Sequence, residues 1–396
     1  MQSAVVVSYE LDDTAEAARE LVAAVKERLT FKKHAAGMLL CDADTDGAML
    51  TRALHDELGI EVAGMTTLAA VNEEGRQTAA VVLTVFTADD CRFRVALADS
   101  LRHGDHERKI AEAGMRCLPQ DTSADAAQGL LLAFCPGGMP FSGDVYPDAL
   151  ARVLPNTPVI GGAASDDYDY ERARVFLSGE EYKDAAAFIG IWGNVKPVFS
   201  LRHVTSRFAE RIRRVTRADG NIVYTVGDET FVRYLEGFGL KTDVADPLLA
   251  FTSYPMMLTR EKSEEVPLMR HISGLHHADG SGSFFGDVPE GALANMCLIT
   301  KNDILSACRD SMNALLEEAK LRPDYDYSTI VCISCCGRSI ILGADAGAEG
   351  RVPAEMLPEG LSLTGAYCLG EICPTLWKDG KVSNRFHNCS IAFCML

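Results

Sequence analysis

Apolar and polar positions follow one another in the same order in three stretches of the chain. Residues 37–67 contain an apolar run, a turn with glycine, an amphipathic helical pattern and a second apolar run that ends near glycine. Residues 129–165 repeat this order, and residues 328–372 repeat it around an insertion. Such internal repetition predicts three similar strand-turn-helix-strand units.

Further short apolar runs follow each unit, and they are rich in β-branched and aromatic residues. These residue types favour strands over helices when the run is short. Strands that alternate with helical patterns are typical of α/β proteins. The sequence therefore predicts an α/β fold made of mixed β-sheets layered with helices.

A different pattern occupies residues 194–300, between the second and third units. The Asp219–Gly220 pair predicts a hairpin turn, and the helical pattern that ends near Lys320 is predicted to start with Asn302 or Asp303 as its N-cap. The change of pattern after Gly193 predicts two modules, residues 1–193 and 194–396.

The net charge of the chain argues against two classes of binding partner. Lys and Arg total 38 against 56 Asp and Glu, which gives a formal net charge of −18. Nucleic acids and anionic membranes attract basic surfaces, so neither is expected as the main partner. No apolar run reaches the length of a membrane span, and the first residues lack the pattern of a secretion signal. A cytoplasmic protein is therefore expected.

Cysteine is frequent, with 13 in the chain, and the segment CISCCGRS at residues 332–339 holds three of them. Most of these cysteines lie in apolar runs, as buried thiols do in a reducing compartment. Cys332 and Cys335 lie three positions apart on a predicted strand and would face opposite sides of the sheet. The sequence therefore predicts neither a metal site nor a cofactor.

Several short motifs, in this order, resemble the FIST domain family. The first half contains FCPGG and PVIGGAASDD, and the second contains VTRADGNIVYTVGDE, GSGSFFGDVPEGA, SCCGR, GAYCLGEICP and FHNCS. The last three motifs are the most specific because they occur in this order near the end of the sequence. The resemblance divides the chain into a FIST N-terminal module and a FIST C-terminal module.

The resemblance implies a function in bacterial signal transduction. FIST modules are thought to sense small ligands, amino acids among them, and to pass the signal to fused output modules. Both modules together use up this sequence, so a stand-alone sensor is expected. Its signal would then reach a separate signalling protein or pass through a homo-oligomer interface.

The matching motifs also imply where a ligand binds. Arg338 follows a strand end, where a guanidinium can clamp a carboxylate, and the glycine pair near residue 161 can expose backbone N–H groups to an anion. The predicted ligand-binding residues are Cys335, Gly337, Arg338, Tyr367, Gly370, Glu371, His387 and Asn388, with Gly161, Gly162 and Asp166 as a second wall.

Three alternatives stay open at this point. Arg338 either faces a ligand or pairs with an internal carboxylate, for which Glu371 is the candidate, and Asp166 either lines a pocket or only closes a turn. Cys335 as nucleophile, with His387 as base and Glu371 as orienter, would suit a Cys-dependent hydrolase or transferase. A protein-interaction scaffold without a ligand is the third possibility; a non-enzymatic sensor is the preferred prediction.

Overall fold

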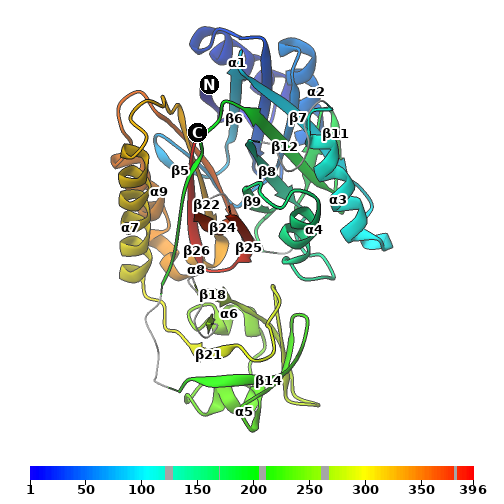
Figure 1. Cartoon of the computed structure of the whole chain (residues 1–396), viewed down its shortest axis with the longest axis vertical. Coiled ribbons are helices and arrows are strands. Elements are labelled where there is room, and N and C mark those ends of the chain that lie inside the picture. Colours follow the sequence, from blue (N-terminus) through cyan, green and yellow to red (C-terminus); the bar gives the residue numbers. More distant parts are fainter. Residues whose placement is uncertain (121–127, 169, 205–210, 260–266, 379–380) are drawn as a thin grey trace.

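The computed structural model describes residues 1–120, 128–168, 170–204, 211–259, 267–378 and 381–396. Three six-stranded β-sheets surround one apolar core, and helices pack on their outer faces (Figure 1). Side chains from all three sheets meet in this core, so the α/β prediction is confirmed. We call this part of the protein the three-sheet body.

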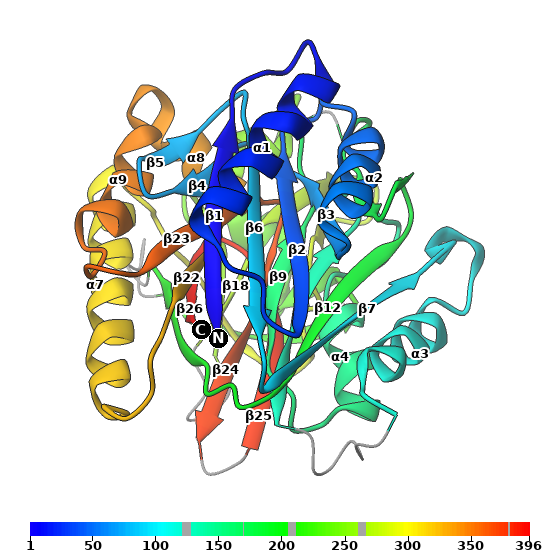
Figure 2. The same cartoon turned by 90° about the horizontal axis from the view of Figure 1, so that it is seen from above.

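The first sheet is built from the N-terminal part of the chain. Its strands, in spatial order, are β1 (Gln2–Ser8), β6 (Val81–Ala88), β2 (His34–Cys41), β3 (Glu61–Thr66), β10 (Val175–Leu177) and β11 (Glu180–Tyr182). Helices α1 (Thr14–Arg28) and α2 (Gly47–Leu58) cover its outer face (Figure 2). Alternate residues of β1 point to the helices and to the central core, as the period of a strand requires.

The second sheet lies beside the first and combines strands from both halves of the chain. Its strands, in spatial order, are β25 (Lys381–His387), β24 (Glu371–Lys378), β9 (Val159–Ala163), β8 (Gly129–Cys135), β12 (Ala186–Gly193) and β7 (Cys91–Ala98). Helices α3 (His106–Cys117) and α4 (Val145–Val153) pack on it, next to the short 3-10 helix η1 (Leu101–His103).

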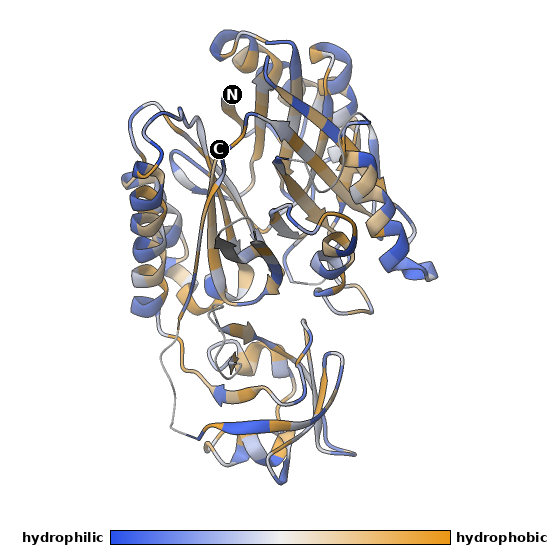
Figure 3. Cartoon of the chain, viewed as in Figure 1, coloured by the Kyte–Doolittle hydropathy of each residue, from blue (hydrophilic) through white to orange (hydrophobic). Residues whose placement is uncertain are grey.

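The third sheet carries the CISCCGRS segment. Its strands, in spatial order, are β13 (Val198–His203), β26 (Ser390–Met395), β22 (Thr329–Cys335), β23 (Ser362–Cys368), β4 (Ala70–Asn72) and β5 (Gly75–Gln77). Its helices are α7 (Lys301–Lys320), α8 (Cys336–Leu342) and α9 (Gly347–Glu355), with the 3-10 helix η2 (Gly343–Asp345). Figure 3 shows polar residues on the solvent side of α7 and apolar residues on the strands behind it.

Residues 211–259 and 267–299, which we call the insert, form a smaller body at one end of the molecule (Figure 1). Its strands, in spatial order, are β18 (Leu268–Arg270), β17 (Met256–Thr259), β21 (Leu293–Met296), β14 (Arg213–Asp219), β15 (Ile222–Val226), β20 (Ser281–Phe284) and β19 (Ile272–His276), while β16 (Glu229–Thr230) pairs with β15. Helices α5 (Phe231–Glu236) and α6 (Pro247–Phe251) close its own apolar core.

The three predicted repeat units are present. Each one places two parallel strands side by side with helical chain between them: β2 with β3, β8 with β9, and β22 with β23. The predicted hairpin is β14–β15, with Gly220 in the left-handed region at φ 54°.

The predicted N-cap of α7 is wrong by a few residues. Thr300 caps this helix, because its hydroxyl accepts the N–H of Asp303 while the Asp303 carboxylate accepts the N–H of Thr300 at 2.9 Å. Asp303 therefore belongs to a capping box rather than being the cap itself.

The two halves of the chain exchange strands. β24 and β25, from the second half, extend the second sheet, whereas β4 and β5, from the first half, extend the third sheet. The predicted module boundary near Gly193 stays a prediction, since each half completes a sheet of the other. This exchange brings motifs from both halves to one place.

Candidate functional site

The CISCCGRS segment turns from strand to helix at the face of the three-sheet body that meets the insert. β22 ends at Cys335, and α8 begins with the next residue. The ring of His271, from the insert, packs against Gly337: a Cβ on this glycine would lie 2.3 Å from the His271 Cε1. Glycine is therefore required here by the close approach of the insert.

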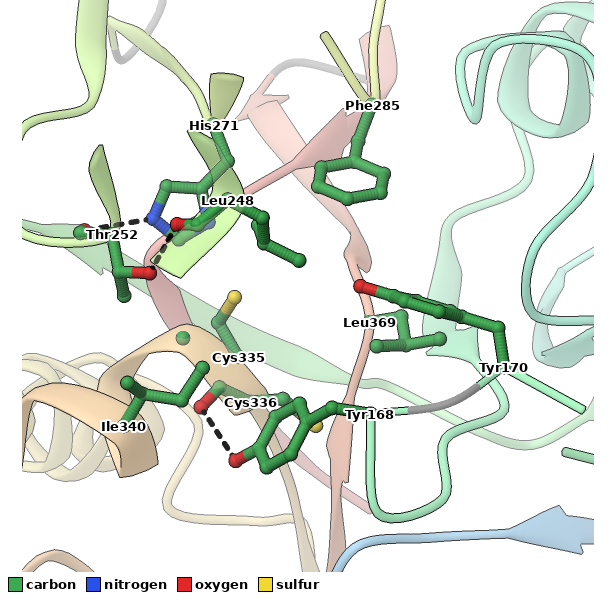
Figure 4. Close-up of a pocket in the computed structure, with 11 residues that line it drawn as sticks. Tyr168, Tyr170, Leu248, Thr252, His271, Phe285, Cys335, Cys336, Ile340 and Leu369 are labelled. Carbon is green, nitrogen blue, oxygen red and sulfur yellow. Dashed lines mark hydrogen bonds between the residues drawn. The ribbon is translucent and has the colours of Figure 1, made fainter. Parts of the chain in front are cut away.

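A small cavity lies at this junction (Figure 4). Its lining residues are Tyr168, Tyr170, Leu248, Thr252, His271, Phe285, Cys335, Cys336, Gly337, Ile340 and Leu369. They come from the insert, from the loop after β9, from the β22–α8 segment and, in the case of Leu369, from the turn after β23. The cavity offers about 20 Å³, which is room for roughly one water molecule. Of the predicted site residues, Cys335 and Gly337 line it.

Glu371 is a neighbour of Cys335 and is fully buried. Its Oε2 accepts hydrogen bonds from the Ser390 hydroxyl at 2.6 Å and the Ser390 N–H at 3.2 Å. Its Oε1 has no hydrogen-bond partner among the described residues. Burial raises the pKa of Glu371 to about 8, although the two hydrogen bonds from Ser390 oppose the shift.

More unpartnered polar atoms lie near Glu371. His387 is opposite Glu371 in the β24–β25 pair, and its ring lies 5.2 Å from that of His203. Within the described chain, His387 Nδ1, Asn388 Nδ2 and both ring nitrogens of His203 lack partners. Burial lowers the pKa of His203 to about 3 and that of His387 well below its usual value. Both imidazoles are therefore neutral at pH 7.

Arg338 does not face Glu371, and the expectation that these two residues pair is corrected by the structure. The Arg338 guanidinium pairs with Glu349 of α9, at 2.5 Å from Nη2 and 2.7 Å from Nε. Its remaining bonds go to the carbonyls of Cys389 and Ile304, and its exposure is 0%. Arg338 therefore ties α8, α9 and α7 together and does not line the cavity.

The predicted second wall is part of the sheet instead of the cavity. Gly161 and Gly162 lie in β9, which pairs with β8 on one side and with β24 on the other. A Cβ on Gly161 would lie 1.9 Å from the Ala133 carbonyl oxygen. The Asp166 carboxylate accepts the N–H groups of Tyr168 and Arg172, both at 3.0 Å. Asp166 thus shapes the loop that carries the cavity tyrosines.

Tyr367 and Gly370 occupy the end of β23 and the turn after it. Tyr367 is buried, its hydroxyl lacks a partner among the described residues, and its carbonyl accepts a bond of 2.6 Å from the Ser165 hydroxyl. The ring of Phe386 packs so close to Gly370 that a Cβ there would lie 2.0 Å from it. Neither residue lines the cavity.

Comparison with family models settles what kind of protein this is. The model of the FIST N domain matches residues 4–229, and that of the FIST C domain matches residues 229–374. The chain belongs to the FIST family. Domains of this family are associated with signal transduction and small-ligand sensing.

One curated relative is an uncharacterized protein of Methanocaldococcus jannaschii, with 26% identity over 208 residues. The match covers 49% of this chain and 38% of that protein, so it spans well under half of the relative. Among solved structures, a cyanuric acid hydrolase aligns over 100% of this FIST chain and 99% of its own, at 11% identity and a TM-score of 0.31. Thermotoga maritima PurL aligns at 9% identity and a TM-score of 0.20, over 99% of this chain and 72% of its own. These low scores carry no argument about function.

Three residues of the FIST site were missed by the sequence reasoning: His271, Cys389 and Glu349. His271 Nε2 lies 2.8 Å from the Cys389 sulfur and 3.0 Å from the Thr252 carbonyl oxygen. Cys389 adopts φ 57°, unusual for a residue other than glycine. The sequence could have indicated Cys389 as a site residue, because it directly follows the predicted site residues His387 and Asn388.

This Cys–His contact does not create a reactive thiolate. Burial raises the pKa of the Cys389 thiol well above its ordinary value, and burial lowers the pKa of His271 to about 4. The pKa of Cys335 is also raised, first by burial and then by the Glu371 carboxyl. The thiols at the junction are therefore protonated at pH 7.

Neither a metal cluster nor a membrane helix is found in the described ranges. No three His, Cys, Asp or Glu side chains there are arranged to hold a metal ion. No helix in the same ranges is long and apolar enough to cross a bilayer.

Two consecutive buried residues fasten the insert to the three-sheet body. Arg270 donates to the Asp144 carboxylate at 2.8 Å and to the Phe386 carbonyl at 2.8 Å. The backbone N–H of His271 donates to Asn388 Oδ1 at 3.3 Å. Arg270 and Asp144 are 1% and 9% exposed in their side chains, so the pair is shielded from solvent. The insert is thus anchored to both halves of the chain at the edge of the cavity.

Proposed function

We propose that this FIST protein is a non-enzymatic sensor that binds a small polar metabolite, an amino acid or a relative of one, at the junction between the insert and the three-sheet body. One observation carries the proposal. Cys335, which lines the cavity, neighbours the fully buried Glu371, one of whose carboxylate oxygens lacks a hydrogen-bond partner among the described residues.

The unpartnered oxygen favours a ligand that donates hydrogen bonds. A buried acceptor without a donor costs about 1–3 kcal/mol, and a ligand N–H would recover that free energy. An ammonium group has three donors and would also favour the ionised carboxylate, offsetting the burial that raises the pKa of Glu371. The amino group of an amino acid meets both requirements.

The size of the cavity supports a conformational response. About 20 Å³ accepts roughly one water molecule, whereas the smallest amino acid has five heavy atoms. Ligand binding would therefore displace the insert from the β22–α8 turn. A ligand that binds the open form better shifts the population toward it, in proportion to the difference in affinity. The ligand-dependent change in the position of the insert would then be the signal.

We also propose that the output lies outside this chain, in a separate signalling protein or in another copy of the same protein. The displaced insert would expose the surfaces around Arg270 and His271, both now buried. The described cysteines are all free and buried, as is usual in the reducing cytoplasm of a bacterium.

A Cys-dependent enzyme is a weaker proposal for the same atoms. The Cys335 and Cys389 thiols have raised pKa values, and nucleophilic cysteines need a lowered one. Mass mapping after iodoacetamide treatment at pH 7 separates the two proposals. The sensor predicts slow labelling of both residues, and fast selective labelling of either would support the enzyme.

A thermal-shift screen tests the sensor directly. The compounds are the standard amino acids, with the matching 2-oxo acids as controls that lack the amine. We expect one or more amino acids to raise the melting temperature by several degrees near saturation. The Glu371→Gln variant, which keeps the shape of the side chain, should lose that shift. A protein stabilised by none of the compounds would favour a scaffold without ligand.

A further inference from the structure

A second, larger concavity lies far along the same strands, at the opposite end from the Cys335 cavity. Its volume is about 470 Å³, within the range of small-molecule sites. One wall comes from β1 and the end of α1, and the other from Ser328, Gly360 and Ser362, at the starts of β22 and β23. We call it the basal groove; it joins the two halves of the chain.

The charge of the basal groove is opposite to that of the molecule. The charged side chains in its lining are Arg28 and Lys32, and no carboxylate is among the lining residues. The chain as a whole carries a formal net charge of −18. Two cations without an acidic residue beside them in the lining form a local site that attracts anions.

These cations are not used in ion pairs with the described carboxylates. No carboxylate oxygen of the described residues lies within 4.0 Å of the charged nitrogens of Arg28 or Lys32. Arg28 is held in place, because its Nη1 donates to the Val5 carbonyl at 2.9 Å. The remaining guanidinium N–H groups are then available in a fixed orientation, which favours recognition of an anion.

The rest of the lining supplies neutral hydrogen-bond donors. The hydroxyl groups of Thr30 and Ser362 and the amide of Gln2 are among them, whereas the hydroxyls of Ser3 and Ser328 already donate to the carbonyls of Ser328 and Leu396 at 3.3 Å and 3.5 Å. An arginine, a lysine and hydroxyl groups match the many acceptor oxygens of a phosphate group. The volume exceeds that of phosphate alone, so the site has room for an organic part as well.

We infer that the basal groove binds a small metabolite that carries a phosphate group. The anion would lie between Arg28 and Lys32, and the hydroxyl of Ser362 would contact it from the other half of the chain. This site is independent of the proposed amino-acid cavity, because its residues lie at the beginning of β22 and Cys335 lies at the end.

Isothermal titration calorimetry with inorganic pyrophosphate, at constant ionic strength, tests this inference on the full chain. We expect saturable binding by the wild type. Lys32→Glu should weaken it at least about tenfold, because a cation becomes an anion in the groove. Lys33→Glu is the matched control, since Lys33 is exposed and lies outside the lining; its affinity should stay near the wild-type value.

Citrate distinguishes phosphate recognition from attraction of any anion. Binding of citrate at least about tenfold weaker than that of pyrophosphate supports a phosphate site. Three results would overturn the inference: no binding heat with pyrophosphate, equal affinity in Lys32→Glu and the wild type, or citrate bound as tightly as pyrophosphate.

Discussion

At the scale of a single residue, Arg338 shows that the SCCGR motif has a structural role in this protein. Its guanidinium is buried with three protein partners, so it stabilises the β22–α8 turn that presents Cys335 and Gly337. The sequence left open whether Arg338 contacts a ligand or pairs with an internal carboxylate, and it placed Arg338 among the ligand-binding residues. It named the wrong carboxylate, because Glu349 lies in the insertion of the third unit, where no pattern indicated that α9 folds back over the strand.

Replacing this arginine should damage the fold and not only ligand binding. Arg338→Ala leaves the carboxylate of Glu349 buried without its cation, and breaking such a pair costs about 3–5 kcal/mol. Urea unfolding followed by circular dichroism measures the loss. Arg309→Ala is the control, because Arg309 is exposed on α7; equal stability of the two variants would contradict the structural role.

Glu371 should make stability depend on pH in a defined direction. Its pKa is about 8 in the folded protein and near 4.5 when unfolded, so between these values the folded state holds a proton that the unfolded state has lost. Stability therefore falls as pH rises from 4.5 to 8, by at most ~1.4 kcal/mol per pH unit.

The Glu371→Gln variant isolates this contribution. The buried histidines have lowered pKa values and act in the opposite direction below about pH 6.5. The difference in unfolding free energy between wild type and variant removes their effect. That difference should shrink or reverse as pH rises from 6.5 to 8, and parallel curves would refute a raised pKa of Glu371.

At the scale of elements, the hydrophobic periodicity of the sequence predicted the strands correctly, but it did not predict how the elements pack against one another. The repeated apolar runs predicted the parallel pairs β2–β3, β8–β9 and β22–β23. The hydrophobic periodicity that predicts each strand depends only on residues that are close together in the sequence. The contact of the insert with α8 depends on residues far apart in the chain, and the sequence around His271 carries no periodic signal for it.

Docking of the insert should depend on the buried pair between Arg270 and Asp144. Asp144→Asn removes the charge that faces Arg270, so the insert should open more often. We expect Cys335 and Cys336 to react with iodoacetamide about tenfold faster or more in this variant, since opening uncovers their cavity. Mass mapping of the labelled peptides gives both rates.

Two controls accompany this labelling experiment. Asp148→Asn changes a half-exposed carboxylate on α4, the helix that follows Asp144 directly, and it should leave the rates unchanged. Cys117 is buried on α3, away from the insert, and should stay slow in every variant. Equal labelling of Cys335 in wild type and Asp144→Asn would show that the pair does not hold the insert closed.

At the scale of the whole molecule, the exchange of strands explains why motifs from both halves converge. β24 brings Glu371 into a sheet of the first half, and the loop after β9 brings Tyr168 and Tyr170 to the third sheet. The hydrophobic pattern predicted the fold class, and the family motifs predicted Cys335 and Gly337, two of the residues that line the cavity. They did not predict which side chains line the cavity, because strand pairing across the two halves decides that.

A crystal structure of the wild-type protein with the most stabilising amino acid tests the proposed binding site most directly. We expect ligand density between the insert and the β22–α8 turn, with the amino nitrogen directed at Glu371 Oε1 and the insert moved away from Gly337. Density in the basal groove alone, or at any other place with the junction unchanged, would contradict the proposed site.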